Sequence, residues 1–328
     1  MEHNYDFLGI GDITTDAFIK LKDPSAHIDI DKGSREICMH FADKIPYEDV
    51  FVVPAVGNAP NAAVAASRLG LKSAVMTNIG DDKNGVECIE ALQEESVGTQ
   101  FVTICKNHKT NYHYVLWFGD DRTILIKHEN YDRKLYDFNK PKWVYLSSMG
   151  ENSLEFHYEL EKYLNDHPEI KLAFQPGTFQ MKLGYEKLAD LYKVTEVFFC
   201  NVEEAKRILN LDEGSHSDEN SIKELLSKMR ALGPKIVVIT DGPRGAYVFD
   251  GYEAWFMPPY PDPKPPYERT GAGDAFASTF TSALALGKTV PEALMWGPIN
   301  SMSVVQYVGA QKGLLDKKNL ENYLKNAP

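Results

Sequence analysis

The chain has 328 residues, of which 43% are hydrophobic, and its formal net charge is −12. This composition is typical of a globular protein with a core, and the acidic balance argues against partners that need basic patches, namely nucleic acids and anionic membranes. The four cysteines form no CxxC pair, so neither a disulfide framework nor a zinc site is indicated, and we expect a cytoplasmic protein with reduced thiols.

Short apolar runs alternate with helical patterns along most of the chain. The runs expected as buried strands are 5–11, 72–80, 142–148, 169–175, 195–201 and 235–242. The segments expected as helices are 61–70, 84–95, 154–166, 202–210 and 221–233. This alternation predicts an α/β fold in one domain over 1–328, with a mostly parallel central sheet between two layers of helices.

Two segments, at about 12–55 and 99–130, interrupt this alternation with half-exposed strand patterns. In the second, two apolar runs flank a Gly-Asp-Asp turn at 119–121, as in a hairpin. We expect the two inserts to form one small β-sheet, a lid over the edge of the main domain. The alternative is a pair of separate edge hairpins.

A proline-rich stretch at 258–268 leads into the sequence Thr-Gly-Ala-Gly-Asp at 270–274 and then into a small, apolar helix pattern. A buried helix start leaves backbone N–H groups without intrahelical partners, and these amides favour an anion. Gly271 and Gly273 allow a ligand to approach the backbone closely. Asp274 is either a helix cap or a general base for a hydroxyl that accepts a phosphoryl group.

The stretch TGAGDAF at 270–276 resembles the C-terminal signature of the PfkB, or ribokinase-like, family of carbohydrate and nucleoside kinases. Other stretches resemble family motifs in the same order along nearly the whole chain. They contain Asp16, Gly57 with Asn61, Gly80 with Asp82 and Gly85, Asn201 with Glu204, Thr240 with Gly242 and Gly245, and a closing segment from Asn300. The resemblance implies a three-layer ribokinase-like sandwich that uses ATP and Mg²⁺.

The resemblance also implies roles for individual residues. Asp274 would be the base, and the amides of Gly271, Ala272 and Gly273 would hold the moving phosphoryl group. The residues implied in acceptor binding are Asp16, Gly57, Asn58 and Asn61. Those implied in nucleotide binding are Asn201, Thr240, Gly242, Gly245, Thr270 and Asn300, with Glu204 near the metal. Glu268 and Arg269 stand where the family usually has Asp-Thr. The resemblance therefore does not decide whether a monovalent cation binds beside this loop.

Each of these residues also has a plainer interpretation. Asp16 and Glu204 alone would be solvated carboxylates, and Asn61 a helix cap. Thr240 would end a strand, and Gly242 to Gly245 would form a turn. Arg122 and Lys127 in the second insert would neutralise an acidic substrate or, more simply, lie on a solvated hairpin face.

Taken together, the motifs predict an ATP-dependent kinase that phosphorylates an alcohol of a small sugar. A nucleoside kinase is the alternative within the fold, because the run NYHYVLWF at 111–118 offers aromatic side chains for a base. A sugar or nucleotide sensor without catalysis is a further alternative, against which the retained Asp274 argues. On resemblance, a homodimer formed through the lid is also expected.

Overall fold

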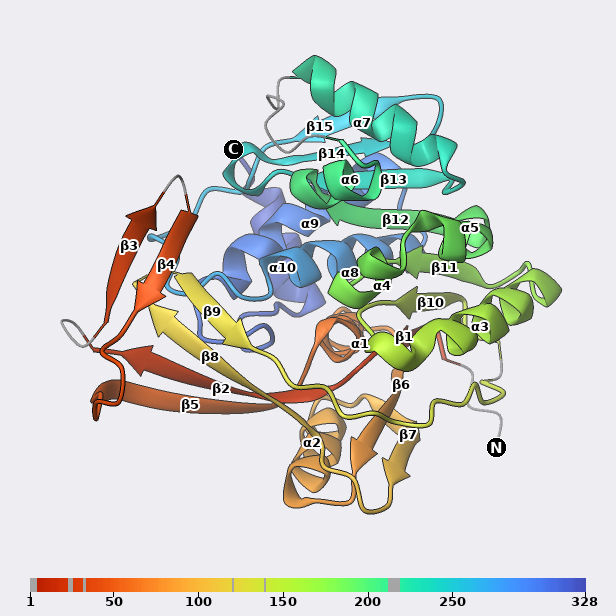
Figure 1. Cartoon of the computed structure of the whole chain (residues 1–328). Coiled ribbons are helices and arrows are strands. Elements are labelled where there is room, and N and C mark those ends of the chain that lie inside the picture. Colours follow the sequence, from red (N-terminus) through yellow and green to blue (C-terminus); the bar gives the residue numbers. More distant parts are fainter. Residues whose placement is uncertain (1–4, 23–25, 32–33, 120, 139, 212–218) are drawn as a thin grey trace.

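The computed structural model of the chain describes residues 5–22, 26–31, 34–119, 121–138, 140–211 and 219–328. Its centre is a nine-stranded sheet (Figure 1). In spatial order the strands are β15 (Ala254–Met257), β14 (Ala246–Phe249), β13 (Ile236–Thr240), β12 (Thr195–Asn201), β11 (Lys171–Phe174), β10 (Trp143–Leu146), β1 (Phe7–Ile10), β6 (Ser73–Gly80) and β7 (Gly98–Cys105). The strands from β13 to β7 run parallel, and β14 and β15 add an antiparallel edge.

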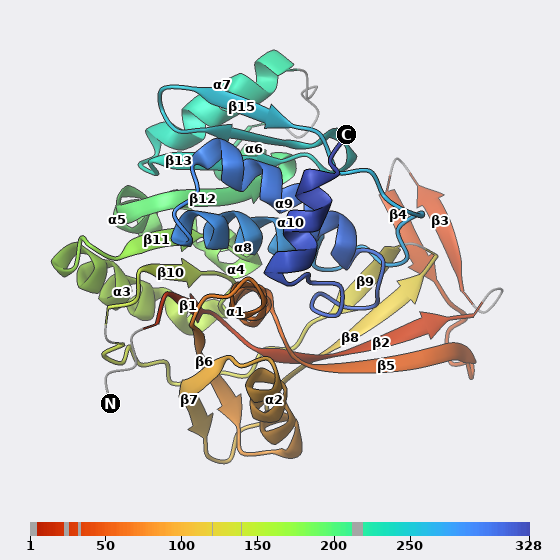
Figure 2. The ribbon, with the colours of Figure 1, turned by 180° about the vertical axis from the view of Figure 1, so that it is seen from behind.

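Helices cover both faces of this sheet, as the alternating pattern predicts. One face carries α3 (Leu154–Asp166), α4 (Thr178–Leu183), α5 (Tyr185–Val194), α6 (Val202–Ile208) and α7 (Glu219–Ala231) (Figure 1). The other carries α1 (Asn58–Arg68), α8 (Ala272–Ala285), α9 (Val290–Val304) and α10 (Lys317–Lys325) (Figure 2). α2 (Lys83–Glu94) packs beside β5 and β7. The fold is therefore the expected three-layer α/β sandwich.

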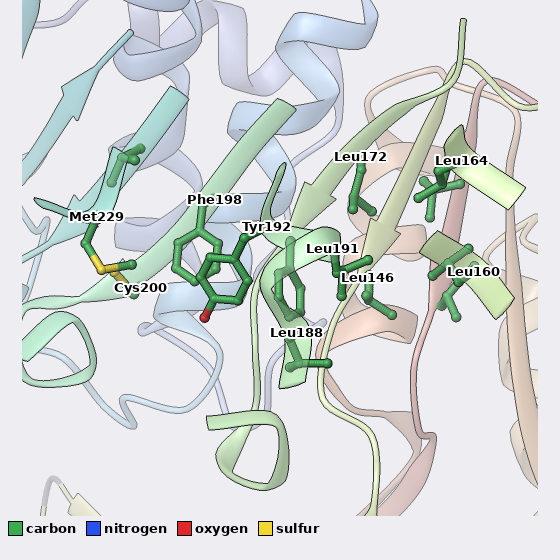
Figure 3. Packing of buried hydrophobic residues seen from close by; sticks show 14 of the residues in the cluster. Leu146, Leu160, Leu164, Leu172, Leu188, Leu191, Tyr192, Phe198, Cys200 and Met229 are labelled. Atoms are coloured by element: carbon green, nitrogen blue, oxygen red, sulfur yellow. The ribbon is translucent and has the colours of Figure 1, made fainter. Parts of the chain in front are cut away.

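A layer of apolar side chains joins each set of helices to the sheet. Figure 3 shows part of the layer beneath α3 and α5, where leucines of the helices meet strand residues such as Leu146, Leu172 and Phe198. On the opposite face Phe276 and Phe280 of α8 pack with Trp296 of α9. Burial of such side chains contributes about 1.5–3 kcal/mol each, which holds the strand ends that carry the site.

A second, smaller sheet has the order β5 (Tyr47–Val56), β2 (Thr14–Leu21), β8 (Asn111–Phe118), β9 (Asp121–Leu125) and is called the small sheet below. Both inserts contribute to it, and β8 pairs antiparallel with β9. Residues 23–25 and 32–33 of the first insert, and residue 120 of the turn, lie outside the described residues. Two short strands, β3 (His27–Asp31) and β4 (Ser34–Cys38), form a separate hairpin.

The structure differs from the sequence patterns in several places. β7 begins at Gly98 and pairs in parallel with β6, so the first part of the 99–130 insert belongs to the large sheet. Its side chains are only half buried because it is an edge strand, which gives it the same pattern as a small-sheet strand. The patterns also do not predict α4, α5, α9 and α10. The short 3₁₀ turns η1 (Glu151–Ser153) and η2 (Gly242–Arg244) complete the fold.

The motif at Gly80, Asp82 and Gly85 has a clear structural use. Asp82 accepts the backbone N–H of Gly85 at 3.0 Å, which caps α2. The same carboxylate accepts the hydroxyl of Thr110 at 2.6 Å and its N–H at 3.1 Å. Asp82 therefore joins the start of α2 to the chain that enters β8. None of the described helices is both long enough and apolar enough to span a bilayer.

Candidate active site

Polar side chains gather where the parallel strands of the large sheet end. Gln175 follows β11, Asn201 ends β12, and Thr240 ends β13. Because carboxyl ends of parallel strands meet at one edge, these residues border a common space, as ligand sites of open α/β sheets do. All three line a cavity of about 440 Å³, the first cavity, which also contains the start of α8 and residues of the small sheet.

The start of α8 leaves space beside its backbone amides. Gly271 caps the helix in the left-handed region, at φ 82°, and a Cβ there would lie 2.4 Å from Cβ of Ala310. Only glycine fits this turn without strain. A Cβ on Gly273, by contrast, would meet no atom within 4 Å, so the space beside it is open. The first N–H groups of α8 and its positive dipole end therefore border open space that suits an anion.

Asp274, in the first turn of α8, receives hydrogen bonds from three neutral side-chain amides. Asn58 Nδ2 donates to Oδ1 at 2.9 Å, Asn61 Nδ2 donates to Oδ2 at 2.9 Å, and Gln175 Nε2 donates to Oδ1 at 3.2 Å. Gln311 Nε2 donates to Asn61 Oδ1 at 3.0 Å, which sets the orientation of that amide. The carboxylate is thus held in one position at the wall of the first cavity.

The surroundings of Asp274 favour a base rather than a permanent anion. Burial raises the pKa of its carboxyl above the ordinary value of 3.8, and the amide hydrogen bonds and the charge of Arg122 only partly offset that effect. A raised pKa means a higher proton affinity, which assists a group that must accept a proton.

The far side of the first cavity is built by Asp16 and His113. They are register partners on β2 and β8, and His113 Nδ1 lies 3.4 Å from Asp16 Oδ1. Asp16 is 8% exposed. Among the described residues, Asp16 Oδ1 and His113 Nε2 are buried without a hydrogen-bond partner. Buried polar atoms of this kind favour a ligand that carries several hydroxyl groups, since each hydroxyl both donates and accepts.

A second aspartate, Asp12, also lines the first cavity, but both of its carboxylate oxygens already have hydrogen-bond partners within the protein. Arg133 Nη2 donates to Oδ1 at 2.6 Å, and Gly150 N and His128 Nδ1 lie 2.8 and 3.1 Å from Oδ2. Burial alone would raise the pKa of Asp12, but His128 and Arg133 outweigh it and lower that pKa. Asp12 is therefore held as an anion and supports the cavity wall.

A second cavity, of about 630 Å³, adjoins the first. Gly242 and Gly245 line it, together with apolar side chains such as Phe276, Pro298 and Met302. Six residues line both cavities, and we call this place the junction: Arg122, Asn201, Thr240, Arg269, Ala272 and Gly273. The two cavities thus meet at the amides that begin α8.

Glu204 shows how a divalent cation would fit near the junction. It lies in the first turn of α6, and its Oε2 accepts the N–H of Asn201 at 2.9 Å. Burial raises the pKa of this carboxyl, and the nearby charge of Asp274 adds to the effect. Among the described residues no group of three or more His, Cys, Asp or Glu side chains is placed to hold a metal. A single carboxylate suits Mg²⁺, which keeps several waters and takes its other ligands from phosphates.

The structure brings most of the residues singled out in the sequence to these cavities. Those that line the first cavity are Asp16, Gly57, Asn58, Asn61, Asn201, Glu204, Thr240, Thr270, Gly271, Ala272, Gly273 and Asp274. Gly242 and Gly245 line the second. Asn300 lines neither: it is wholly buried, and it donates to Thr279 Oγ1 at 2.8 Å and accepts Leu315 N–H at 2.9 Å. Its neighbours Ser301 and Met302 reach the second cavity instead.

Sequence motifs do not reveal Gln175, Asp12, His113 and His128. One signal was available for Gln175, since a polar residue directly after a buried parallel strand marks the ligand edge of the sheet. The two histidines lie in and after the hairpin of the second insert and carry no motif.

The family model and the similar proteins that match this chain all point to one family of kinases. The model of the pfkB family of carbohydrate kinases matches residues 26–318. Ribokinase of Bacillus subtilis is 28% identical over 278 residues, which cover 82% of this chain and 87% of that protein. An ATP-dependent 6-phosphofructokinase of Thermoanaerobacterium thermosaccharolyticum is 26% identical and covers 79% of this chain and 81% of its own length.

The fold agrees with this assignment. The structure of Arabidopsis thaliana ribokinase complexed with ribose and ATP superposes with a TM-score of 0.81 at 19% identity, over 98% of this chain and 99% of that one. A nucleoside kinase of Methanocaldococcus jannaschii gives 0.76 at 18% identity, over 99% of each chain. The chain belongs to the pfkB family of carbohydrate kinases and has the ribokinase fold.

Proposed function

We propose that the protein transfers the terminal phosphoryl group of ATP to an alcohol of a small sugar. The observation that carries this proposal is the junction: two cavities meet at the amides that begin α8, with Asp274 on the wall of one of them. The first cavity has unpartnered buried polar atoms that suit a polyol. The second has glycines for close approach and apolar walls that suit the adenine ring.

In this mechanism Asp274 takes the proton of the acceptor hydroxyl. The terminal phosphorus leaves the oxygen of ADP and bonds to the acceptor oxygen, while the amides of Gly271, Ala272 and Gly273 hold the charge on the moving group. Asp16, Gly57, Asn58 and Asn61 position the acceptor, and Asn201, Thr240, Gly242, Gly245 and Thr270 position the nucleotide. Asn300 supports the second cavity through α9 without reaching it.

The small sheet acts as the lid in this proposal. Its strands come from two distant segments and place Asp16, His113 and Arg122 on the cavity side. Covering the acceptor excludes water, which otherwise competes for the phosphoryl group. We treat 1–328 as one domain to which the small sheet belongs.

Mg²⁺ is expected near Glu204 and Asn201, where it would neutralise the triphosphate. The fit rests on the partly buried Glu204 carboxylate and its raised pKa, which an adjacent cation would relieve. Glu268 is fully buried and accepts the N–H of Thr270 in the loop beside which a monovalent cation would bind.

A sugar is favoured over a nucleoside by the aromatic residues of β8. Tyr114 is 49% exposed and points away from the cavity, being the register partner of Ala17 rather than of Asp16. Trp117 is buried against Tyr267. None of the Tyr, Trp and Phe side chains of β8 lines the first cavity, so these rings form no slot for a base there. Phe179 does line it, which keeps a nucleoside as the alternative acceptor.

The test is phosphoryl transfer from ATP to ribose, fructose, 2-keto-3-deoxygluconate, adenosine and other nucleosides, with thermal shifts for the same panel. Asp274→Asn should lower kcat by at least about 10²-fold while the acceptor still binds. Asp190→Asn, an exposed substitution on α5 outside both cavities, is the matched control and should be neutral. Equal turnover of Asp274→Ala and the wild type would contradict the role of Asp274 as base, whereas ligand binding without turnover by the wild type would support a sensor of sugar or nucleotide.

We further propose a cytoplasmic homodimer that pairs through the outer face of the small sheet. Val50, Val52, Tyr114 and Leu125 lie on that face and are 42–53% exposed. A continuous apolar face of this kind favours association with a second copy. Sedimentation equilibrium of the wild type and of Val52→Lys measures it, and a wild-type monomer at all concentrations would exclude it.

A further inference from the structure

The charge at the junction is poorly matched to a nucleotide unless a cation compensates. Asp274 and Glu204 line the first cavity, and Glu203 lines the second. An incoming polyphosphate adds further negative charge. Among the described residues that line the two cavities, the lysine and arginine side chains are Arg122 and Arg269, and both lie at the junction. These two guanidinium groups are therefore the cationic side chains placed to act on the transferred group, beside the Mg²⁺ expected at Glu204.

The two arginines face different surroundings. Arg269 lies close enough to Asp262 that its charge counteracts the effect of burial, which raises the pKa of that carboxyl. Asp262 lines only the second cavity. The charge of Arg122, in contrast, acts on Asp274, the carboxylate at the reacting end. Arg122 also belongs to the small sheet, whose Asp16 and His113 line the first cavity, so it is the arginine on the acceptor side of the proposed transfer.

Two carboxylates lie beside the Arg122 guanidinium: Nη1 donates to Asp121 Oδ1 at 3.2 Å, and Glu268 lies on the Nε side. Arg122 Nε lies 3.7 Å from Glu268 Oε1, and the glutamate side chain is wholly buried. The same oxygen accepts the N–H of Thr270 at 2.8 Å and its hydroxyl at 2.6 Å. Among the described residues Glu268 Oε2 has no hydrogen-bond partner. Because a buried carboxylate requires a cation, Glu268 both orders the loop before α8 and attracts Arg122 to it.

A second contact fixes the same two segments. Trp117 is the register partner of Arg122 across β8 and β9, and its ring meets the edge of Tyr267 at 5.0 Å between centroids. Tyr267 and Glu268 both donate their N–H groups to the carbonyl of Val305, at 2.8 and 3.3 Å. Two neighbours on the small sheet therefore contact two consecutive residues that precede the amides of α8. This is a defined geometry rather than a solvated hairpin face.

We propose that Arg122 is a catalytic residue supplied by the small sheet, whose guanidinium binds the terminal phosphate at the junction, and that Glu268 is the residue that positions it. The inference rests on the proposed function. In the transfer the bond between phosphorus and the ADP oxygen breaks, the bond to the acceptor oxygen forms, and the acceptor's proton goes to Asp274. Arg122 neither gives nor takes a proton; its forked N–H groups stabilise the charge on the moving group.

The first experiment compares Arg122→Ala, Arg122→Lys and the wild type in transfer from ATP. Arg122→Ala should lower kcat/KM for ATP by about 10²–10³-fold. Arg122→Lys should recover only part, since it keeps the charge but loses the fork. Lys127→Ala is the matched control, because Lys127 lies just beyond β9 and is 70% exposed, and it should be neutral.

The second experiment needs no acceptor. Calorimetric binding of AMP-PNP and of ADP to Arg122→Ala should show that the variant loses about tenfold more affinity for the triphosphate analogue than for ADP. Unchanged relative affinity, with kcat/KM within threefold of the wild type, would overturn the role of Arg122. If the wild type transfers phosphate to no acceptor, the proposed function fails, whereas this binding ratio still decides whether Arg122 holds the terminal phosphate.

The role of Glu268 is tested by a double-mutant cycle. Glu268→Gln keeps the hydrogen bonds to Thr270 but removes the buried charge beside Arg122 Nε, and it should lower kcat by about tenfold with little change in the KM for the sugar. In the Arg122→Ala background the same change should have little further effect. Additive losses in the double variant would show that Glu268 acts independently of Arg122.

Discussion

Asp274 and Asp12 are two carboxylates on the wall of the same cavity, yet their surroundings move their pKa values in opposite directions. Burial raises the pKa of Asp274, and its hydrogen-bond donors, Asn58, Asn61 and Gln175, are all neutral amides. Burial acts in the same direction on Asp12, but the hydrogen bond from His128 and the charge of Arg133 bring its pKa below the ordinary value. The neutral donors lower the pKa of Asp274 only partly against the effect of burial, whereas the groups around Asp12 outweigh that effect.

This difference separates catalysis from stability within a single cavity. Asp274 keeps its proton affinity beside the amides of α8, where the proposed reaction needs a base. Asp12 joins the end of β1 to Gly150 and to Arg133, two points far along the chain, and its charge is used within the fold. Measurements of unfolding and of turnover on the same variants test whether the two carboxylates differ in this way.

The largest expected effect is on stability, at Asp12. Asp12→Asn leaves Arg133, whose side chain is 2% exposed, without its carboxylate partner. Removing one member of a buried ion pair costs about 3–5 kcal/mol, so the urea-derived free energy of unfolding should fall by that amount. Asp274→Asn should change the same quantity by about 1 kcal/mol or less, because the loss of a desolvated charge offsets the altered hydrogen bonds.

A double variant provides the control for Asp12. Asp12→Asn combined with Arg133→Met removes both charges and should recover part of the lost stability. If Asp12→Asn instead costs no more than Asp274→Asn, the two carboxylates do not differ as their surroundings indicate.

An intermediate effect on stability is expected from His157, a buried residue of α3. Its Nδ1–H donates to the carbonyl of Ser153, and Gln180 Nε2 donates to its Nε2. Burial lowers its pKa to about 4 from the ordinary 6.5. The unfolded chain therefore binds more protons below pH 6.5, and the free energy of unfolding falls as pH falls, by about 2 kcal/mol between pH 7 and pH 5.

The check is denaturation at both pH values. His157→Gln should flatten this pH dependence by about 2 kcal/mol, whatever its stability at pH 7. The exposed His108→Gln should leave the dependence as in the wild type. A His157→Gln curve parallel to that of the wild type would place the acid sensitivity of the fold elsewhere.

The same two aspartates show how far sequence reasoning reaches. The corner at Gly271 to Asp274 is predictable because a helix start, two glycines and a carboxylate lie within four residues. Asn201 follows from its resemblance to a family motif, and Thr240 from its place at the end of a strand. Asp12 gives no such signal, since Arg133 and Gly150 reach it from more than a hundred residues away. Gln175 is likewise 99 residues from Asp274 in the chain.

Two errors of placement have a similar physical origin. α9 is buried on nearly all sides, so its composition does not show which face meets the second cavity, and Asn300 points inward between α8 and the segment after α9. β7 alternates like a strand of the small sheet because an edge strand is also half exposed. Long-range contacts, rather than local patterns, decide both cases.

The smallest expected effect concerns Gln175, and it tests the difference between neutral and charged donors most directly. Gln175 contacts Asp274 through one hydrogen bond of 3.2 Å, and its oxygen accepts the hydroxyl of Tyr145. Gln175→Met keeps the approximate shape but removes the donor. Because that hydrogen bond favours the charged carboxylate, its loss should raise the pKa of Asp274 further, and the acid limb of kcat/KM should move to higher pH. On the alkaline plateau kcat should stay within about threefold, since the base is still deprotonated there.

Asp190→Asn controls for a general effect of substitution. An acid limb that stays in place, or moves to lower pH, would mean that a group other than Asp274 sets it. The different surroundings of Asp274 and Asp12 would then have no demonstrated link to turnover.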